Sequence, residues 1–153
     1  SKSKHKIEEF IDYDYVGSPW RQVFLDMILL QTLGNSNNNG VGNGGFSFRK
    51  RSAMLKSINN NKYKNTAEDV FYSGTDLNFP SRDKAKTFSV ESVFYDSPYG
   101  IHKPWLYLDD KKLDELSKDC PEIDTIFNRG KKYGGPTNIF SYLFKAMNDL
   151  YLR

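Results

Sequence analysis

Alternating apolar and polar positions predict short β-strands in the first two thirds of the chain. The predicted strands are residues 13–16, 45–48 and 92–95. The first ends at Gly17-Ser18-Pro19, a turn sequence in which glycine and proline interrupt a regular strand. The second follows directly on a glycine-rich stretch.

Apolar residues at helical spacing predict helices between and after these strands. The predicted helices are residues 7–11, 21–33, 49–58, 67–73, 84–88, 109–117, 122–127 and 137–152. In the third of them we expect Met54, Leu55 and Ile58 to face the core, and we expect Thr66 to be the N-cap of the fourth. Strands and helices are interleaved, which favours an α/β or α+β fold with a helical C-terminal segment.

Length and composition favour one globular domain, or part of one, spanning residues 1–153. The sequence GNSNNNG at residues 34–40 has no core-forming residues and is predicted to be a mobile loop. The formal net charge is only +3, which does not favour a nucleic-acid partner. No stretch approaches the roughly 18 apolar residues of a membrane span. Cys120 is the single cysteine, so a reducing, cytoplasmic location is expected.

The sequence VGNGGFSFR at residues 41–49 places three glycines within four positions. With Gly40 included, the glycines differ from the dinucleotide-binding fingerprint, because their spacing is GxGxGG and the predicted strand follows them instead of preceding them. Two interpretations remain open. The glycines form a hairpin turn, or they form a bare backbone floor on which a sugar or phosphate lies.

Two adjacent acids, Glu68 and Asp69, stand at the start of a predicted helix. Acidic residues in a first turn stabilise a helix through its dipole, which is the structural interpretation. A carboxylate in a pocket can also take a proton from an attacking hydroxyl, a contribution of typically about 10²–10⁴ in rate. Spacing alone leaves both interpretations open.

The sequence SPYGIHKPW at residues 97–105 concentrates an imidazole, an ammonium and an indole. A lone histidine such as His102 is often structural. With Lys103 and Trp105 beside it, however, a pyrophosphate or metal site is an equal candidate. A DxD string at residues 12–14 is not expected to bind metal, because the segment before it is amphipathic and charged instead of a buried strand.

Five blocks of sequence, in order, resemble a glycosyltransferase-like family. They are DYVGSPW at residues 14–20, GNGGFSFR at 42–49, ED at 68–69, FSVE at 88–91 and GIHKPW at 100–105. The family carries DYIGAPW, GNGGFSLR, ED, FSVE and FGxHKPW at similar spacings. By resemblance it belongs to the GT-A glycosyltransferases, which transfer a sugar from a nucleotide-diphosphate donor.

The resemblance implies a role for each candidate site residue. Asp69 would be the catalytic base, with Glu68 as the second choice. His102 would be a ligand of Mn²⁺ or Mg²⁺, and Lys103 a partner of the donor diphosphate. The residues implied to contact the donor or acceptor sugar are Asn43, Gly44, Gly45 and Trp105.

The resemblance also implies that this chain is the C-terminal, acceptor-side portion of a GT-A-like mixed sheet flanked by helices. The nucleotide-binding half is then expected upstream in the same polypeptide or in a partner chain. The expected function is sugar transfer from a nucleotide-diphosphate sugar to a hydroxyl acceptor. The alternative is a catalytically silent carbohydrate-binding or interaction module on the same scaffold.

Overall fold

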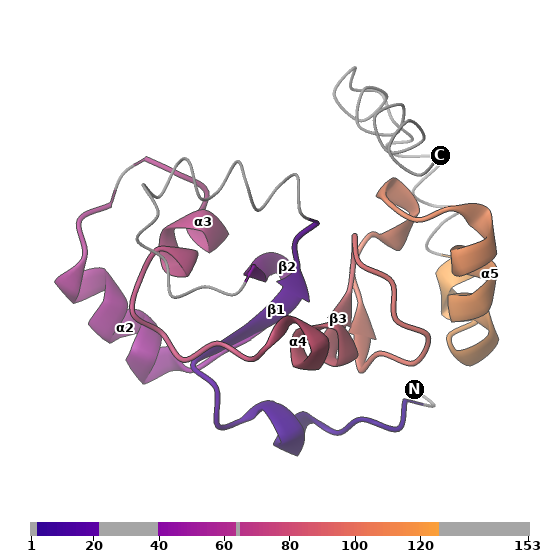
Figure 1. Cartoon of the computed structure of the whole chain (residues 1–153), viewed down its shortest axis with the longest axis horizontal. Coiled ribbons are helices and arrows are strands. Elements are labelled where there is room, and N and C mark those ends of the chain that lie inside the picture. Colours follow the sequence, from indigo (N-terminus) through magenta and orange to yellow (C-terminus); the bar gives the residue numbers. More distant parts are fainter. Residues whose placement is uncertain (1–2, 22–39, 64, 126–153) are drawn as a thin grey trace.

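The computed structural model describes residues 3–21, 40–63 and 65–125 (Figure 1). It is a mixed α/β fold with one small antiparallel sheet, one small parallel sheet and several helices, so the predicted class is confirmed. The mobile loop expected at residues 34–40 and the helices expected at 21–33 and 137–152 fall almost entirely outside the described residues.

The antiparallel sheet pairs β1 (Tyr15–Pro19) with β2 (Val41–Arg49). Tyr15 lies opposite Arg49 at one end, and the register shifts on either side of Ser18. Every residue of β1 is buried. At Gly17 a side chain has no room, because a Cβ would overlap the backbone carbonyl of Asn43 on the neighbouring strand. The predicted strands at 13–16 and 45–48 are thus present, with later or wider bounds.

The parallel sheet pairs β3 (Ser89–Val90) with β4 (Gly100–Ile101). The strand expected at residues 92–95 is wrong, because the extended pairing ends at Val90 and residues 92–95 form bends and irregular chain. The apolar residues Phe94 and Tyr95 instead pack from this irregular segment against the neighbouring hydrophobic cluster. The apolar residues alone did not distinguish a β-strand from an irregular segment that packs on the core.

The helices of the described chain lie close to their predicted positions, except η2, which the sequence did not predict. They are η1 (Ile7–Phe10), α2 (Arg51–Asn60), α3 (Glu68–Ser73), α4 (Arg82–Phe88), η2 (Pro104–Leu106) and α5 (Asp110–Asp119). Residues 122–125 are also helical. Figure 1 shows α2 and α3 on one side of β1 and β2, and α5 on the other side beyond β3. Helix α4 lies between α2 and α3 on one side and α5 on the other, and it contacts both β1 and β3.

Two expectations about helix faces and ends are wrong. In α2, Met54 is buried, but Leu55 and Ile58 are 47% and 51% exposed. Adjacent helical positions differ by about 100° in direction, so Met54 and Leu55 do not share the centre of one face. The cap of α3 is Ala67, with no side-chain hydrogen bond, instead of Thr66.

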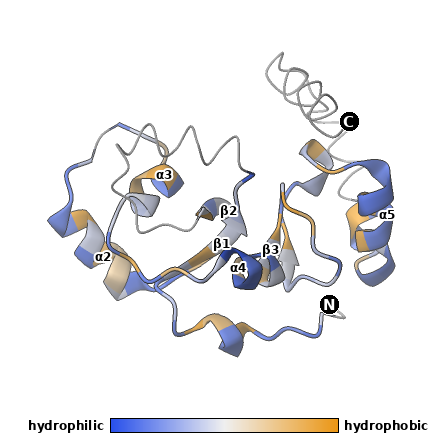
Figure 2. Cartoon of the chain, in the orientation of Figure 1, coloured by the Kyte–Doolittle hydropathy of each residue, from blue (hydrophilic) through white to orange (hydrophobic). Residues whose placement is uncertain are grey.

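Within the described residues, the core consists of three hydrophobic clusters that follow this arrangement. One surrounds Tyr15 and Val41, one surrounds Phe10, Val16 and Phe88, and one lies between the parallel sheet and α5. The members of the third cluster are Val90, Leu108, Leu113, Leu116 and Ile123. Figure 2 shows the corresponding division of α5 into a hydrophobic and a hydrophilic side. Among the described residues, no helix is long and apolar enough to span a membrane.

Candidate functional site

The glycine-rich segment lies inside strand β2, so the hairpin-turn interpretation is wrong. The Gly44 N–H donates to Asp69 Oδ2 at 3.4 Å. A Cβ on Gly45 would overlap the His102 ring, and a Cβ on Gly44 would overlap the ends of the Glu68 and Arg49 side chains. The two glycines therefore allow the His102 imidazole, the Glu68 carboxylate and the Arg49 guanidinium to approach the strand backbone.

Arg49, at the end of β2, is paired with the first of the two acids. Arg49 Nη2 lies 2.5 Å from Glu68 Oε1, and the guanidinium lies over the Tyr15 ring at 4.8 Å. It also donates to Tyr15 Oη at 3.1 Å and to the Gly44 carbonyl at 3.4 Å. The Glu68 side chain is 57% exposed and is paired with the Arg49 guanidinium, which makes Glu68 the weaker candidate for a base.

Asp69 lies deeper than its neighbour and accepts only backbone N–H groups. Its Oδ1 accepts from Val70 N at 2.8 Å, and its Oδ2 faces Gly44 N. It forms no salt bridge within the described part of the chain. Burial, and then the negative charge of Glu68, raise the pKa of the Asp69 carboxyl. A carboxylate with a raised pKa is a stronger proton acceptor than an exposed one.

His102 is hydrogen-bonded to Glu91, a residue that the sequence did not single out as part of a site. Nδ1 of His102 lies 2.9 Å from Oε1 of Glu91, which is only 4% exposed. Burial raises the pKa of Glu91 to about 7, an effect that the Lys103 charge opposes and the Asp69 charge reinforces. Burial, followed by Lys103, lowers the pKa of His102. Both shifts favour the uncharged forms of the two partners.

Lys103 and Trp105 follow His102 but point to different surroundings. Lys103 has a left-handed backbone, with φ of 43° and ψ of 43°, which is unusual for a residue other than glycine. Its side chain is exposed, and it forms no salt bridge with another described residue. Trp105 is partly buried and packs against the third hydrophobic cluster.

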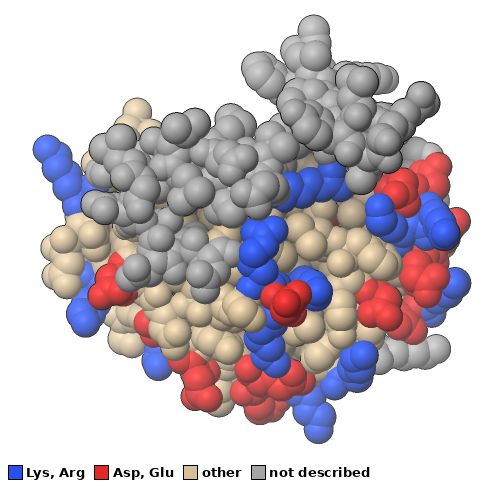
Figure 3. All heavy atoms as spheres, viewed as in Figure 1, with Lys and Arg blue, Asp and Glu red and all other residues tan. Residues whose placement is uncertain are grey.

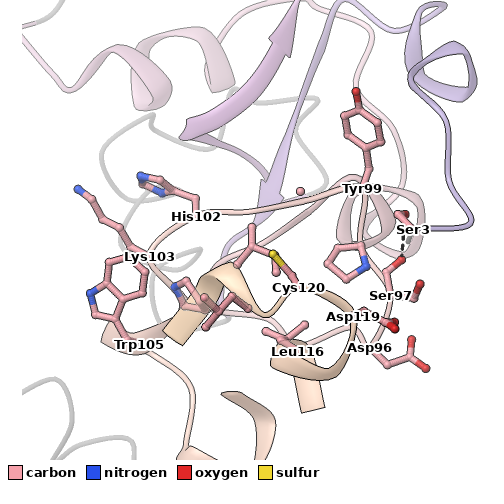
Figure 4. Close-up of a pocket in the computed structure, with 15 residues that line it drawn as sticks. Ser3, Asp96, Ser97, Tyr99, His102, Lys103, Trp105, Leu116, Asp119 and Cys120 are labelled. Atoms are coloured by element: carbon pink, nitrogen blue, oxygen red, sulfur yellow. Dashed lines mark hydrogen bonds between the residues drawn. The ribbon is translucent and has the colours of Figure 1, made fainter. Parts of the chain in front are cut away.

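A cavity of about 320 Å³ lies beside this segment, between residues 96–105 and the end of α5 (Figure 4). His102, Lys103 and Trp105 lie toward one end of it, and Asp96, Ser97 and Asp119 toward the other. Its lining is mainly apolar and includes Ile101, Leu116 and Ile123.

A sequence comparison with protein families matches the segment that holds this site. A family model described as "Protein of unknown function (DUF5672)" matches residues 2–102. The chain belongs to the DUF5672 family. The match includes β1, β2, Glu68, Asp69 and Glu91, and it ends at His102. Searches among curated proteins and among solved structures found no match.

The structure brings together most of the site residues that the sequence of this DUF5672 chain predicted. Gly44, Gly45, Glu68, Asp69 and His102 lie within one set of contacts. Asn43 has a local role instead, because its Oδ1 accepts from the Gly45 N–H at 3.1 Å. The Trp105 side chain packs against the third hydrophobic cluster.

Reasoning from the sequence missed Arg49 and Glu91 as parts of the site. Both stand inside motifs used for the resemblance, FSFR and FSVE, and that was the only available signal. Asp14, in the DxD string, accepts from Asn78 N at 3.1 Å and so connects two segments of the fold.

The described residues do not fit a complete site for the implied Mn²⁺ or Mg²⁺. No group of three or more His, Cys, Asp or Glu side chains in residues 3–21, 40–63 and 65–125 could hold a metal ion. Nδ1 of His102 is already bound to Glu91, which leaves Nε2 alone. These ions also prefer oxygen ligands over imidazole nitrogen.

Proposed function

We propose that this DUF5672 chain carries the acceptor side of a glycosyl-transfer site. In this proposal a hydroxyl acceptor attacks the anomeric carbon of a nucleotide-diphosphate sugar, and the nucleotide-binding part is supplied by further polypeptide. The observation that carries the proposal is Asp69, a half-buried carboxylate with a raised pKa at a glycine floor. The motif resemblance supplies the reaction class.

Asp69 has the properties of a general base. Glu68 is held by Arg49, whereas the Asp69 carboxylate contacts only N–H groups of the backbone. Its raised pKa strengthens it as a proton acceptor at neutral pH. In the proposed step Asp69 takes the proton of the acceptor hydroxyl while the new C–O bond forms at the anomeric carbon.

Lys103 would act on the other side of the reacting carbon. The bond between that carbon and the donor diphosphate breaks as the acceptor adds, so negative charge accumulates on the departing phosphate oxygens. An ammonium held near those oxygens stabilises this charge. Lys103 is exposed, and its charge reaches both Glu91 and His102 electrostatically. The strained backbone of Lys103 is consistent with a side chain held in place for function.

The test is transfer by the chain together with the polypeptide that supplies the nucleotide-binding part, with a panel of UDP- and GDP-sugars and glycan acceptors. Products are measured by mass spectrometry, with added Mn²⁺, with added Mg²⁺ and with chelator. We expect Asp69→Asn to reduce the rate by about 10²–10⁴ and Glu68→Gln to reduce it less. Asp83→Asn is the matched control, because Asp83 is an exposed acid paired with Lys86 on α4.

Transfer that survives Asp69→Asn at the wild-type rate would refute the assignment of the base. Saccharide binding without transfer, including after the upstream polypeptide is supplied, would favour the catalytically silent carbohydrate-binding module. The mixed surface charge of the chain favours neither of these functions over the other. Figure 3 shows basic and acidic side chains interspersed over the visible face.

A further inference from the structure

We propose that Glu91 is a positioning residue that fixes the His102 ring and leaves Nε2 as the nitrogen presented to a bound ligand. Glu91 has no role in the proposed base chemistry. The orientation of the ring follows from the contacts of this chain alone. The nature of the ligand, a sugar nucleotide with its hydroxyl acceptor, rests on the proposed function.

The strand register places the two residues side by side. In the parallel pair β3–β4, Ser89 lies opposite Gly100 and Val90 opposite Ile101. Glu91 directly follows β3 and His102 directly follows β4. The His102 N–H donates to the Val90 carbonyl at 2.9 Å. The side chains of adjacent strands therefore leave the sheet next to each other, which brings Oε1 to 2.9 Å from Nδ1.

Gly45 fixes the other side of the ring. A Cβ at this position would lie 2.6 Å from Nε2 and still closer to Nδ1 and Cε1. The imidazole thus lies directly against the backbone of β2. The ring is held between a strand without a side chain and a carboxyl group, so rotation would break the hydrogen bond.

The environment of Glu91 indicates that this hydrogen bond is its main role. The side chain is 6% exposed, and His102 is its hydrogen-bond partner. Its other oxygen, Oε2, is buried and has no hydrogen-bond partner among the described residues. Burying a carboxyl group with one oxygen unpaired is unfavourable. Burial raises its pKa to about 7, and the charges of Asp69 and Lys103 both act on it.

Nε2 is the ring nitrogen without a hydrogen-bond partner among the described residues. The His102 side chain is 24% exposed. Histidines with a defined role commonly use one ring nitrogen for the ligand while a carboxylate holds the other. The Glu91–His102 pair matches that division.

The experiment alkylates the full chain with bromoacetate and measures the ratio of Nε2- to Nδ1-carboxymethylhistidine. A His5→Gln background leaves His102 as the single histidine. We expect predominantly the Nε2 product from this reference protein. Glu91→Leu should raise the Nδ1 share roughly tenfold, because a buried hydrogen bond is lost. Glu91→Gln should retain the reference ratio, because its amide oxygen or nitrogen can still bond Nδ1.

Two further variants keep the result interpretable. Glu91→Asp shortens the side chain by one methylene and should release Nδ1 even where Glu91→Leu fails to fold, as judged by circular dichroism. Glu9→Leu in the same background is the control for the Glu-to-Leu change itself, because Glu9 contacts Lys84 and Lys6 and not His102. It should leave the product ratio unchanged.

Comparable amounts of both products in the reference protein would overturn the proposal. So would an unchanged ratio in folded Glu91→Leu or Glu91→Asp. The outcome is separable from that of the proposed function. Nε2-selective alkylation without any sugar transfer would refute the transferase and leave the positioning of His102. Alkylation of both nitrogens in a chain that transfers sugar would refute the positioning alone.

Discussion

Replacement of Gly45 by alanine tests whether the glycine floor exists for the His102 ring. The new Cβ would lie 2.6 Å from Nε2, whereas unstrained carbon contacts are about 3.5–4.0 Å. No positive φ occurs at Gly45, so the backbone accepts alanine and the conflict is with the ring. The ring must therefore move, and its hydrogen bond with Glu91 is lost.

The expected cost follows from that lost bond. Leaving a buried polar partner unsatisfied costs about 1–3 kcal/mol. Alanine restricts the unfolded chain more than glycine does, which offsets roughly 0.4–1 kcal/mol. We therefore expect Gly45→Ala to lower the free energy of unfolding by about 1–2 kcal/mol. Gly44→Ala should cost less, because its Cβ meets the flexible ends of Glu68 and Arg49.

The assay is urea unfolding followed by far-UV circular dichroism, arranged as a double-mutant cycle with His102→Ala. In the His102→Ala background the ring is absent, so Gly45→Ala should be neutral or slightly stabilising. The coupling free energy should then be about 1–3 kcal/mol, typical of residues in contact. Equal costs of Gly45→Ala in both backgrounds, within about 0.5 kcal/mol, would refute the contact.

Three further predictions concern the same region. Tyr15→Phe should lower the free energy of unfolding by about 1–2 kcal/mol, because the buried hydroxyl donates to the Gly42 carbonyl at 2.6 Å and accepts from Arg49. Urea unfolding of the variant measures this loss. An unchanged urea midpoint would contradict it. Glu91 has a folded-state pKa of about 7 against an ordinary 4.5, so the native state binds more protons between these values and stability falls as pH rises through them. Across this pH window the free energy of unfolding of the wild type should fall by up to about 3 kcal/mol relative to that of Glu91→Gln. Parallel curves of unfolding free energy against pH for the two proteins would contradict this. The raised pKa of Asp69 predicts that any transfer rate increases with pH as its carboxyl deprotonates, and Asp69→Asn should abolish that limb of the pH–rate profile.

Local patterns predicted the helices of this fold better than their faces. The positions of α2, α4 and α5 follow from apolar spacing. The structure adds a local cap that was not predicted, Asp109, whose side chain accepts from Lys112 N at the start of α5. These signals act within about four residues, so they survive without tertiary information. Which side of α2 is buried depends on what packs against it, and the prediction for Leu55 and Ile58 was wrong.

The candidate site divides in the same way. Glycines in series, paired acids and a histidine beside a lysine are recognisable from residue chemistry, and they marked Gly44, Gly45, Asp69 and His102. Their hydrogen-bond partners are not recognisable in this way. Glu91 is 11 positions from His102, and Arg49 is 19 positions from Glu68.

The sequence by itself determined the mixed α/β class, the approximate helix positions and the residue types available for chemistry. Only the tertiary structure decided that the glycines lie in a strand, that Glu68 is occupied by Arg49, and that Glu91 holds His102. The physical reason is range. Helix periodicity and capping are interactions between near neighbours, whereas these contacts depend on strand register and on burial. Both are set when segments distant in sequence pack together.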